Sequence, residues 1–149
     1  MDLDAVRAGL EMAVPFNQHL GLKVIELRPG RGVVALPDTA ALRNHVGTQH
    51  AGGLFAAGEA ASGAAFVSVF ADRLDDIVPL AESARIAYRR LARGPVTATA
   101  RLRDDPEELL DRLDEDGRVR FPVHVELTNA PGDVVADMEV QWQVSRRPG

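Results

Sequence analysis

NHVGTQHAGGLFAAGEAASGAAFV is the sequence of residues 44–67, and it predicts the element around which the rest of the chain folds. The stretch begins as a polar loop and continues as a long run of small and apolar residues. From Ala51 to Ala71 the only ionisable side chain is that of Glu59. A helix that is apolar or small on every side is expected to be buried. We therefore predict a central helix over about residues 52–70, enclosed by other structure, with one carboxylate inside it.

Glycines recur along this predicted helix, at positions 52, 53, 58 and 63. Each glycine in a helix interior costs roughly 1 kcal/mol relative to alanine. That cost is tolerable where another backbone passes very close to the helix. The glycines therefore predict close backbone contacts on the central helix.

The whole chain has the size and composition of a single folded domain, which we expect to span residues 1–149. It has 46% hydrophobic and 26% charged residues, which is ordinary for a globular protein. Its formal net charge of −5 argues against nucleic acid as a partner, because phosphate binding favours a basic face. The absence of cysteine excludes disulfides, thiolate catalysis and cysteine–zinc sites, and no spacing of histidines and carboxylates predicts another metal site.

The N-terminal residues, MDLDAVRAGLEM, are acidic at their start and have no apolar core, so they predict no secretory signal. We therefore expect a cytoplasmic protein. The run from Ala51 to Ala71 is long enough to span a bilayer. It is dominated by alanine and glycine, however, and its central carboxylate would be costly in lipid. We expect no membrane insertion.

Short helices and strands are predicted on both sides of the central helix. Leu3–Ala13 predicts an amphipathic helix that ends before Pro15, and Phe16–Leu20 is expected to be a connector. Strands are predicted over residues 22–27, 33–36, 82–91, 96–103, 118–127 and 134–144. Because tight turns join several of these strands, we expect antiparallel pairing. The predicted class is α+β, with one curved antiparallel sheet wrapped around the long central helix.

An acidic segment, DDPEELLDRLDEDG, forms an insertion over about residues 104–117, between two of the predicted strands. Asp105 as N-cap and Pro106 at the first helical position predict a short helix there. A solvated surface helix is one interpretation of this segment, and an acidic partner site is the alternative.

The start of the central helix resembles the hotdog-fold acyl-CoA thioesterases, in particular the phenylacetate-pathway-like branch. That branch carries a pattern close to N-x-x-G-x-x-H-G-G-x-x-F-x-x-A-D. The matching residues here are Asn44, Gly47, His50, Ala51, Gly52, Leu54-Phe55, Gly58 and Glu59. Tyr88, within RIAYRRLARG, resembles a later strand motif of the family. The chain departs from the pattern at Ala51, where the branch has glycine, and at Glu59, where it usually has aspartate.

The resemblance implies a hotdog fold and hydrolysis of an acyl-CoA or acyl-ACP (acyl-carrier-protein) thioester. Coenzyme A would be part of the substrate, so no cofactor is expected. Unpaired N–H groups of Ala51 and Gly52 at the helix start would polarise the thioester carbonyl. Glu59 would act as general base or nucleophile, and its apolar surroundings should raise its pKa.

Two loop residues are further candidates for the catalytic site. Asn44 either positions water or substrate or only forms a turn. His50 either caps the helix or contacts the carbonyl. Candidate substrate-binding residues are Gly53, Phe55, Ser83, Arg85 and Tyr88. Arg85 and its neighbouring arginines would meet the phosphates of coenzyme A, or would form a solvated strand edge.

Helix geometry adds a constraint on this site. Eight residues separate Ala51 from Glu59, which is about 12 Å along a helix axis. The two residues of one chain therefore cannot act on the same carbonyl carbon. A homodimer with two antiparallel central helices would bring Glu59 to the helix start of the partner chain. We expect a homodimer or a dimer of dimers, that is, a homotetramer.

Two other functions stay open. The 3-hydroxyacyl thioester dehydratases, also hotdog proteins, pair a histidine with a carboxylate on the central helix. His45 lies fourteen residues before Glu59, a spacing that resembles this branch, although the proline-glycine that precedes the helix there is missing here. The other possibility is a non-catalytic hotdog dimer that binds an acyl or CoA ligand without hydrolysing it.

Overall fold

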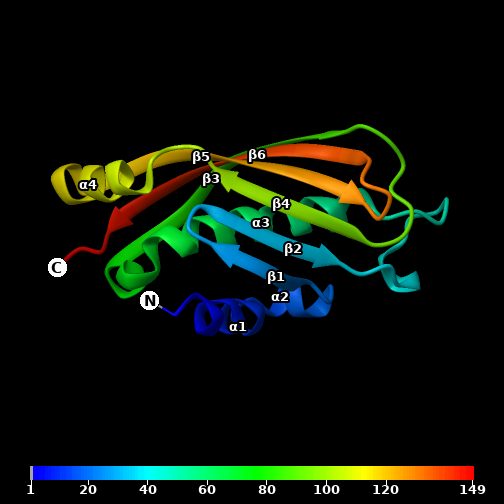
Figure 1. Cartoon of the computed structure of the whole chain (residues 1–149), viewed down its shortest axis with the longest axis horizontal. Helices are drawn as coiled ribbons and strands as arrows, with labels where there is room; N and C mark the ends of the chain where they lie inside the picture. The colour runs from blue at the N-terminus through cyan, green and yellow to red at the C-terminus, as the bar shows by residue number, and fades with distance from the viewer. Residues whose placement is uncertain (1) are drawn as a thin grey trace.

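A six-stranded antiparallel sheet wraps around one long helix (Figure 1). The computed structural model describes residues 2–149. The long helix, α3, runs from Ala51 to Phe70, and the strand order across the sheet is β1-β2-β4-β5-β6-β3. This is the predicted α+β arrangement, with the sheet curved around the central helix.

The elements follow one another in the predicted order, with two differences. They are α1 Leu3–Ala13, α2 Pro15–His19, β1 Lys23–Arg28, β2 Arg31–Leu36, the short 3-10 helix η1 Ala40–Leu42, α3 Ala51–Phe70, a second 3-10 segment η2 Ala71–Asp76, β3 Ile77–Tyr88, β4 Val96–Leu102, α4 Pro106–Asp116, β5 Arg118–Asn129 and β6 Val134–Arg146. The prediction of a connector over residues 16–20 is wrong, because a short helix begins there at Pro15. Proline is well suited to the first helical position, where no intrahelical N–H bond is lost. Strand β3 begins at Ile77, earlier than predicted, and tolerates Pro79 because it is an edge strand.

Helix α3 is buried on most of its surface against the inner face of the sheet. Its buried side chains include Leu54, Ala61 and Phe70, which face inward-pointing residues of β2, β4 and β5. The residues of α3 that remain partly or fully accessible include Ala51, Phe55, Glu59 and Gly63. These four recur every fourth residue and therefore lie along one side of the helix. The all-round burial expected from the sequence is thus incomplete within a single chain.

The close backbone approach that the helical glycines predict occurs at a strand glycine instead. A Cβ atom on Gly32 of β2 would lie 2.8 Å from the carbonyl oxygen of Ala61 and from the amide nitrogen of Ala65. At Gly58 of α3 the obstacle is a side chain, since a Cβ there would lie 2.5 Å from the sulfur of Met138. Within one chain the expectation is therefore wrong for the α3 glycines, although α3 and β2 do pack at backbone distance.

The acidic insertion forms α4 at one end of the sheet (Figure 1). Its N-cap is Asp105, whose carboxylate accepts a hydrogen bond from the N–H of Glu107 at 3.1 Å. Leu109 and Leu113 are fully buried, and the helix packs on β5. Asp114 accepts two hydrogen bonds of 2.8 Å from Arg73. The insertion is therefore anchored to the domain by an apolar side and an ion pair.

The two edges of the sheet are treated differently. At the β1 edge, α1 supplies hydrogen bonds to Val24: the Arg7 guanidinium donates to its carbonyl at 3.1 Å, and the Glu11 carboxylate accepts from its N–H at 2.9 Å. At the other edge, β6 is the single strand that pairs with β3 in the described part of the chain, and nearly all residues of β3 are exposed. An open edge of this length is a ready site for pairing with another strand.

One segment, Ala51–Asp76, is long and apolar enough to cross a membrane. Of the 18 most apolar consecutive residues in this segment, 72% are buried inside the fold. A buried core helix of a folded domain can be equally long and apolar. Helix α3 lies inside the curved sheet, as such a core helix does.

Candidate functional site

The loop that leads into α3 is organised by the side chain of Asn44. Its Nδ2 donates to the Thr48 hydroxyl at 2.8 Å and to the Gln49 carbonyl at 3.3 Å. Its Oδ1 accepts from the N–H groups of Val46 at 3.1 Å and Thr48 at 3.0 Å. An amide side chain has two donor hydrogens and two acceptor lone pairs, so all of its capacity is used. Asn44 therefore shapes the loop, and no atom of its side chain is left for the water or substrate contact considered from the sequence.

Gln49 ties the same loop to two other segments, and sequence reasoning missed it. Its Nε2 donates to the carbonyls of Pro37 and Gly94, both at 3.0 Å. Its backbone N–H donates to the carbonyl of Ala92 at 2.8 Å. Gln49 is only 3% exposed. No pattern in a polar loop marks one glutamine as buried, because its burial depends on three distant segments meeting.

His50 is the N-cap of α3. Its Nδ1 accepts a hydrogen bond of 2.8 Å from the N–H of Gly52. The expectation that the Gly52 N–H is unpaired is therefore wrong, whereas the N–H of Ala51 has no hydrogen-bond partner within residues 2–149. Because Nδ1 acts as acceptor, the ring proton of neutral His50 is assigned to Nε2. The helix start thus presents the free N–H of Ala51 and the imidazole N–H of His50.

Tyr88, at the end of β3, reaches this helix start. Its hydroxyl donates to the carbonyl of Ala51 at 3.0 Å. Partial burial raises the pKa of the Tyr88 hydroxyl above its ordinary value, so the hydroxyl stays protonated near neutral pH. The structure therefore brings the candidates Ala51 and Tyr88 together. Of the other two candidates in the first turns of α3, Gly53 is buried and Phe55 is 37% exposed.

Glu59 lines an apolar cavity of about 190 Å³ between α3, the two N-terminal helices and the inner face of the sheet. Its walls include Leu10, Val14, Phe66 and Trp142. Burial raises the pKa of the Glu59 carboxyl above its ordinary value, and no ion pair or side-chain hydrogen bond within residues 2–149 opposes this shift. A carboxyl with a raised pKa in the wall of an apolar cavity is a strong candidate for a functional group.

Ser83 and Arg85 lie on the opposite face of the sheet from this cavity. In the pairing of β3 with β6, Ser83 is opposite Gln141 and Arg85 is opposite Glu139. Directly opposed residues share a face of the sheet. The neighbouring Val140 is fully buried and belongs to the core around α3, so Gln141 and Glu139 point the other way. The structure does not bring Ser83 and Arg85 to Glu59 within one chain, and their substrate-binding role stays a prediction.

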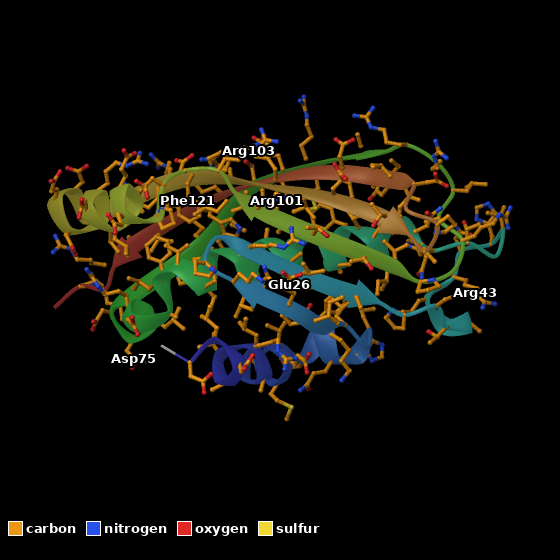
Figure 2. The ribbon with its side chains drawn as sticks, in the orientation of Figure 1. Glu26, Arg43, Asp75, Arg101, Arg103 and Phe121 are labelled. Carbon is orange, nitrogen blue, oxygen red and sulfur yellow. The ribbon has the colours of Figure 1, made fainter. Side chains whose placement is uncertain are left out.

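Arg85 belongs instead to a charged hollow of about 780 Å³ on the outer face of the sheet. A row of directly opposed residues crosses five strands there: Arg31, Arg101, His124, Glu139 and Arg85. Figure 2 labels the side chains of Arg101 and Arg103 on this part of the molecule. The sheet separates this hollow from the cavity that Glu59 lines.

His45 lies exposed in the loop before α3, whereas Glu59 lies two turns into the helix. The pair considered for a dehydratase is therefore not assembled within one chain. Within residues 2–149 no group of three or more histidine, aspartate or glutamate side chains is arranged to hold a metal ion.

The model of a family described as a domain of unknown function (DUF4442) matches residues 4–144. No curated protein matches the chain. Among solved structures, a Pseudomonas aeruginosa protein of unknown function, described as a probable thioesterase, is 29% identical with a TM-score of 0.86. The match covers 99% of this chain and 97% of that one.

Two further similar structures are PaaI proteins of phenylacetic acid degradation. The Escherichia coli protein is 21% identical, with a TM-score of 0.74 and coverage of 99% and 95% of the two chains. A mutant of the Thermus thermophilus protein is 29% identical, with a TM-score of 0.67 and coverage of 90% and 100%. These neighbours share the hotdog fold, so the fold expected from the sequence is confirmed.

Proposed function

We propose that this chain, which belongs to the DUF4442 family, hydrolyses acyl thioesters of coenzyme A or acyl carrier protein. The observation that carries the proposal is the Glu59 carboxyl, which lines an apolar cavity and has a pKa raised by burial. The similar Pseudomonas aeruginosa protein is described as a probable thioesterase, which supports the same reaction here. The reaction needs only water besides the thioester, so the proposal includes no cofactor.

Glu59 is the group that activates the nucleophile in this proposal. As a general base it takes a proton from water while the water oxygen bonds to the carbonyl carbon. The carbon–sulfur bond then breaks, and the proton passes to the departing thiolate. Alternatively, the carboxylate itself attacks the carbonyl carbon and the carbon–sulfur bond breaks, which releases the thiolate. Water then hydrolyses the resulting anhydride to the free acid and the Glu59 carboxyl, and a proton from this water protonates the thiolate. A raised pKa makes Glu59 a stronger base near neutral pH in either role.

The start of α3 stabilises the negative charge that develops on the carbonyl oxygen. The N–H of Ala51 is free for this role and lies at the positive end of the helix dipole. The Nε2–H of His50 is a second donor, because its Nδ1 is occupied by the Gly52 N–H. Tyr88 holds the Ala51 carbonyl and so positions the first residue of the helix.

A second copy of the chain completes the site. Ala51 and Glu59 remain separated by about 12 Å along α3, so they serve different carbonyl carbons within one chain. Two features support a partner: an accessible stripe on a helix that is otherwise buried, and the unpaired edge of β3. We propose a homodimer, alone or as half of a homotetramer, in which each site combines Glu59 of one chain with the helix start of the other.

One observation favours a second candidate function, acyl binding without hydrolysis. The Gly52 N–H is occupied by His50, so one of the two amides expected to polarise the carbonyl, that of Gly52, is not free. A site with weaker oxyanion stabilisation would bind a thioester and turn it over slowly.

The substitution Glu59→Gln tests the proposal. It removes the basicity while keeping the shape of the side chain, so we expect hydrolysis of a medium-chain acyl-CoA to fall by about 10²-fold or more. The measurement is kcat in a thiol-release assay. Ligand binding, measured by calorimetry with a non-hydrolysable thioether of coenzyme A, should be retained.

Glu126→Gln is the matched control, because Glu126 lies exposed on the outer face of the sheet. Its kcat should equal that of the wild type. Turnover by Glu59→Gln within about threefold of the wild type would remove Glu59 from the mechanism. Binding by a wild-type protein that shows no turnover would favour the non-catalytic function.

A further inference from the structure

Gly63 of α3 is a helical glycine that packing within one chain does not require. The nearest atom to a Cβ at this position would be Cζ2 of Trp142, at 3.8 Å, which is ordinary van der Waals contact. At Gly58, by contrast, a Cβ would lie 2.5 Å from the sulfur of Met138, which is too close. Alanine would fit at position 63 and would stabilise the helix by roughly 1 kcal/mol relative to glycine. The absence of a side chain there calls for another explanation.

The position of Gly63 supplies that explanation. It lines the same cavity as Glu59 and lies one turn further along the same side of α3, about 6 Å away along the axis. The missing Cβ points toward Trp142, which is itself a wall of the cavity. Any side chain at position 63 would therefore occupy cavity space directly behind the carboxyl.

The cavity has the size and character of a site for a small apolar group. Its volume is about 190 Å³, and apolar side chains of α1, β1, β2, α3 and β6 form most of its wall. An apolar cavity of about 150 Å³ is large enough to bind benzene. The polar groups that reach it are Glu59, Glu11 and Asn17. Glu11 is already engaged by the Val24 N–H, which leaves Glu59 as the carboxyl available for chemistry.

We propose that this cavity binds the acyl tail of the substrate and that the missing side chain of Gly63 sets the length of tail accepted. The proposal rests on the function proposed above, because it puts the thioester carbonyl at Glu59. The tail then runs past Gly63 toward α1 and α2. The volume fits an apolar acyl group of about six to eight carbon atoms. Longer tails would meet Leu10 of α1 and Val14, which lies between α1 and α2.

Trp142 allows the cavity to be tested without turnover. It is the single tryptophan of the chain, it lines the cavity, and its ring stacks on Phe66 at a centroid distance of 5.0 Å. Bromohexanol is a neutral apolar probe whose bromine quenches indole fluorescence on contact. We expect saturable quenching in the wild type. Gly63→Leu fills the cavity, and its half-saturation concentration should rise by at least about tenfold.

Gly9→Leu is the matched control. Gly9 is also a helical glycine, no atom lies within 4 Å of a Cβ there, and the residue is not part of the cavity wall. This variant should be quenched like the wild type. Gly63→Ala is the milder test, because alanine is a stronger helix former and should fold at least as well as the wild type. It should weaken quenching less than Gly63→Leu does.

The activity measurement uses acyl-CoA substrates from butanoyl to dodecanoyl. In the wild type, kcat/KM should peak near six to eight carbons, and in Gly63→Leu the peak should move shorter by about two to four carbons. KM should change more than kcat for the longer substrates.

Three results would overturn the proposal: quenching that does not saturate in the wild type, quenching that is equal in wild type and Gly63→Leu, or an unchanged chain-length profile. Loss of the wild-type oligomer in Gly63→Ala, measured by light scattering, would also overturn it, since Gly63 would then be needed for a subunit contact. If quenching follows the proposal but no acyl-CoA is hydrolysed, the cavity assignment stands and the proposed function fails.

Discussion

The Glu59 side chain lines the cavity wall with its pKa raised by burial above the ordinary glutamate value. The same feature that makes it a stronger base disfavours the folded state when the carboxyl is ionised. The folded protein binds this proton more tightly than the unfolded chain does. The contribution of Glu59 to the free energy of unfolding is therefore largest at pH values below its pKa in the unfolded chain. This contribution declines as the pH rises through its pKa in the folded protein.

The raised pKa of Glu59 predicts how the stability of Glu59→Gln, relative to the wild type, depends on pH. The variant lacks the titrating group, so it should be more stable than the wild type at about pH 8, and the difference should vanish below about pH 4. Urea unfolding across this range measures the difference. Glu126→Gln serves again as the control. A difference that does not change with pH would show that the carboxyl is not desolvated in the folded protein.

At the scale of elements, the loop before α3 decides how the helix begins. Its geometry depends on one amide side chain with all its hydrogen bonds inside the loop, and on Gln49, which joins the loop to two other segments. The N-cap at His50 then fixes which backbone N–H groups stay free. The proposed oxyanion donors therefore depend on the loop as well as on the helix.

Asn44→Ala should disturb this loop. It leaves the N–H groups of Val46 and Thr48 without their acceptor, and we expect a loss of about 1–3 kcal/mol in the free energy of unfolding. Turnover should fall together with stability, because the helix start loses its position. Asn44→Asp keeps the acceptor oxygen and should lose less. A variant with wild-type stability and strongly reduced kcat would instead give Asn44 a direct contact with substrate.

At the scale of the whole molecule, the open β3 edge and the accessible stripe of α3 support the proposal that a second chain completes the site. The capped β1 edge shows the contrast, because α1 supplies hydrogen bonds to that strand. A protein that covers one edge and leaves the other open has a preferred side for association.

Complementation tests the shared site. Glu59→Gln removes the base, and Ala51→Pro removes the donor N–H at a helix position where proline is tolerated. Each homodimer should be inactive. After mixing and refolding, about half of the dimers are heterodimers with one intact site of two, so activity should recover to roughly a quarter of the wild type. Heterodimers that form, as seen by native mass spectrometry, and yet stay inactive would exclude the shared site.

Features that depend on local chemistry were predictable from the sequence. The apolar and small residues of 51–71 predict a buried helix with one carboxylate, and α3 follows. A tight turn is expected between the first two predicted strands, and β1 pairs with β2 across Pro29 and Gly30. Asp105 and Pro106 predict the start of α4. Each of these signals acts between residues close in the chain, where capping, turn geometry and periodicity determine the conformation.

The arrangement of the site was decided only by the tertiary structure. The facing of Ser83 and Arg85 depends on a register shift between Ala81 and Ser83, and such a shift changes which face a side chain occupies. The cavity at Glu59 depends on α1 and β6 meeting beside α3, and no local pattern encodes that meeting. Long-range packing chooses among faces and partners that are locally equivalent, so the sequence by itself determined the elements and the tertiary structure decided which of their side chains meet.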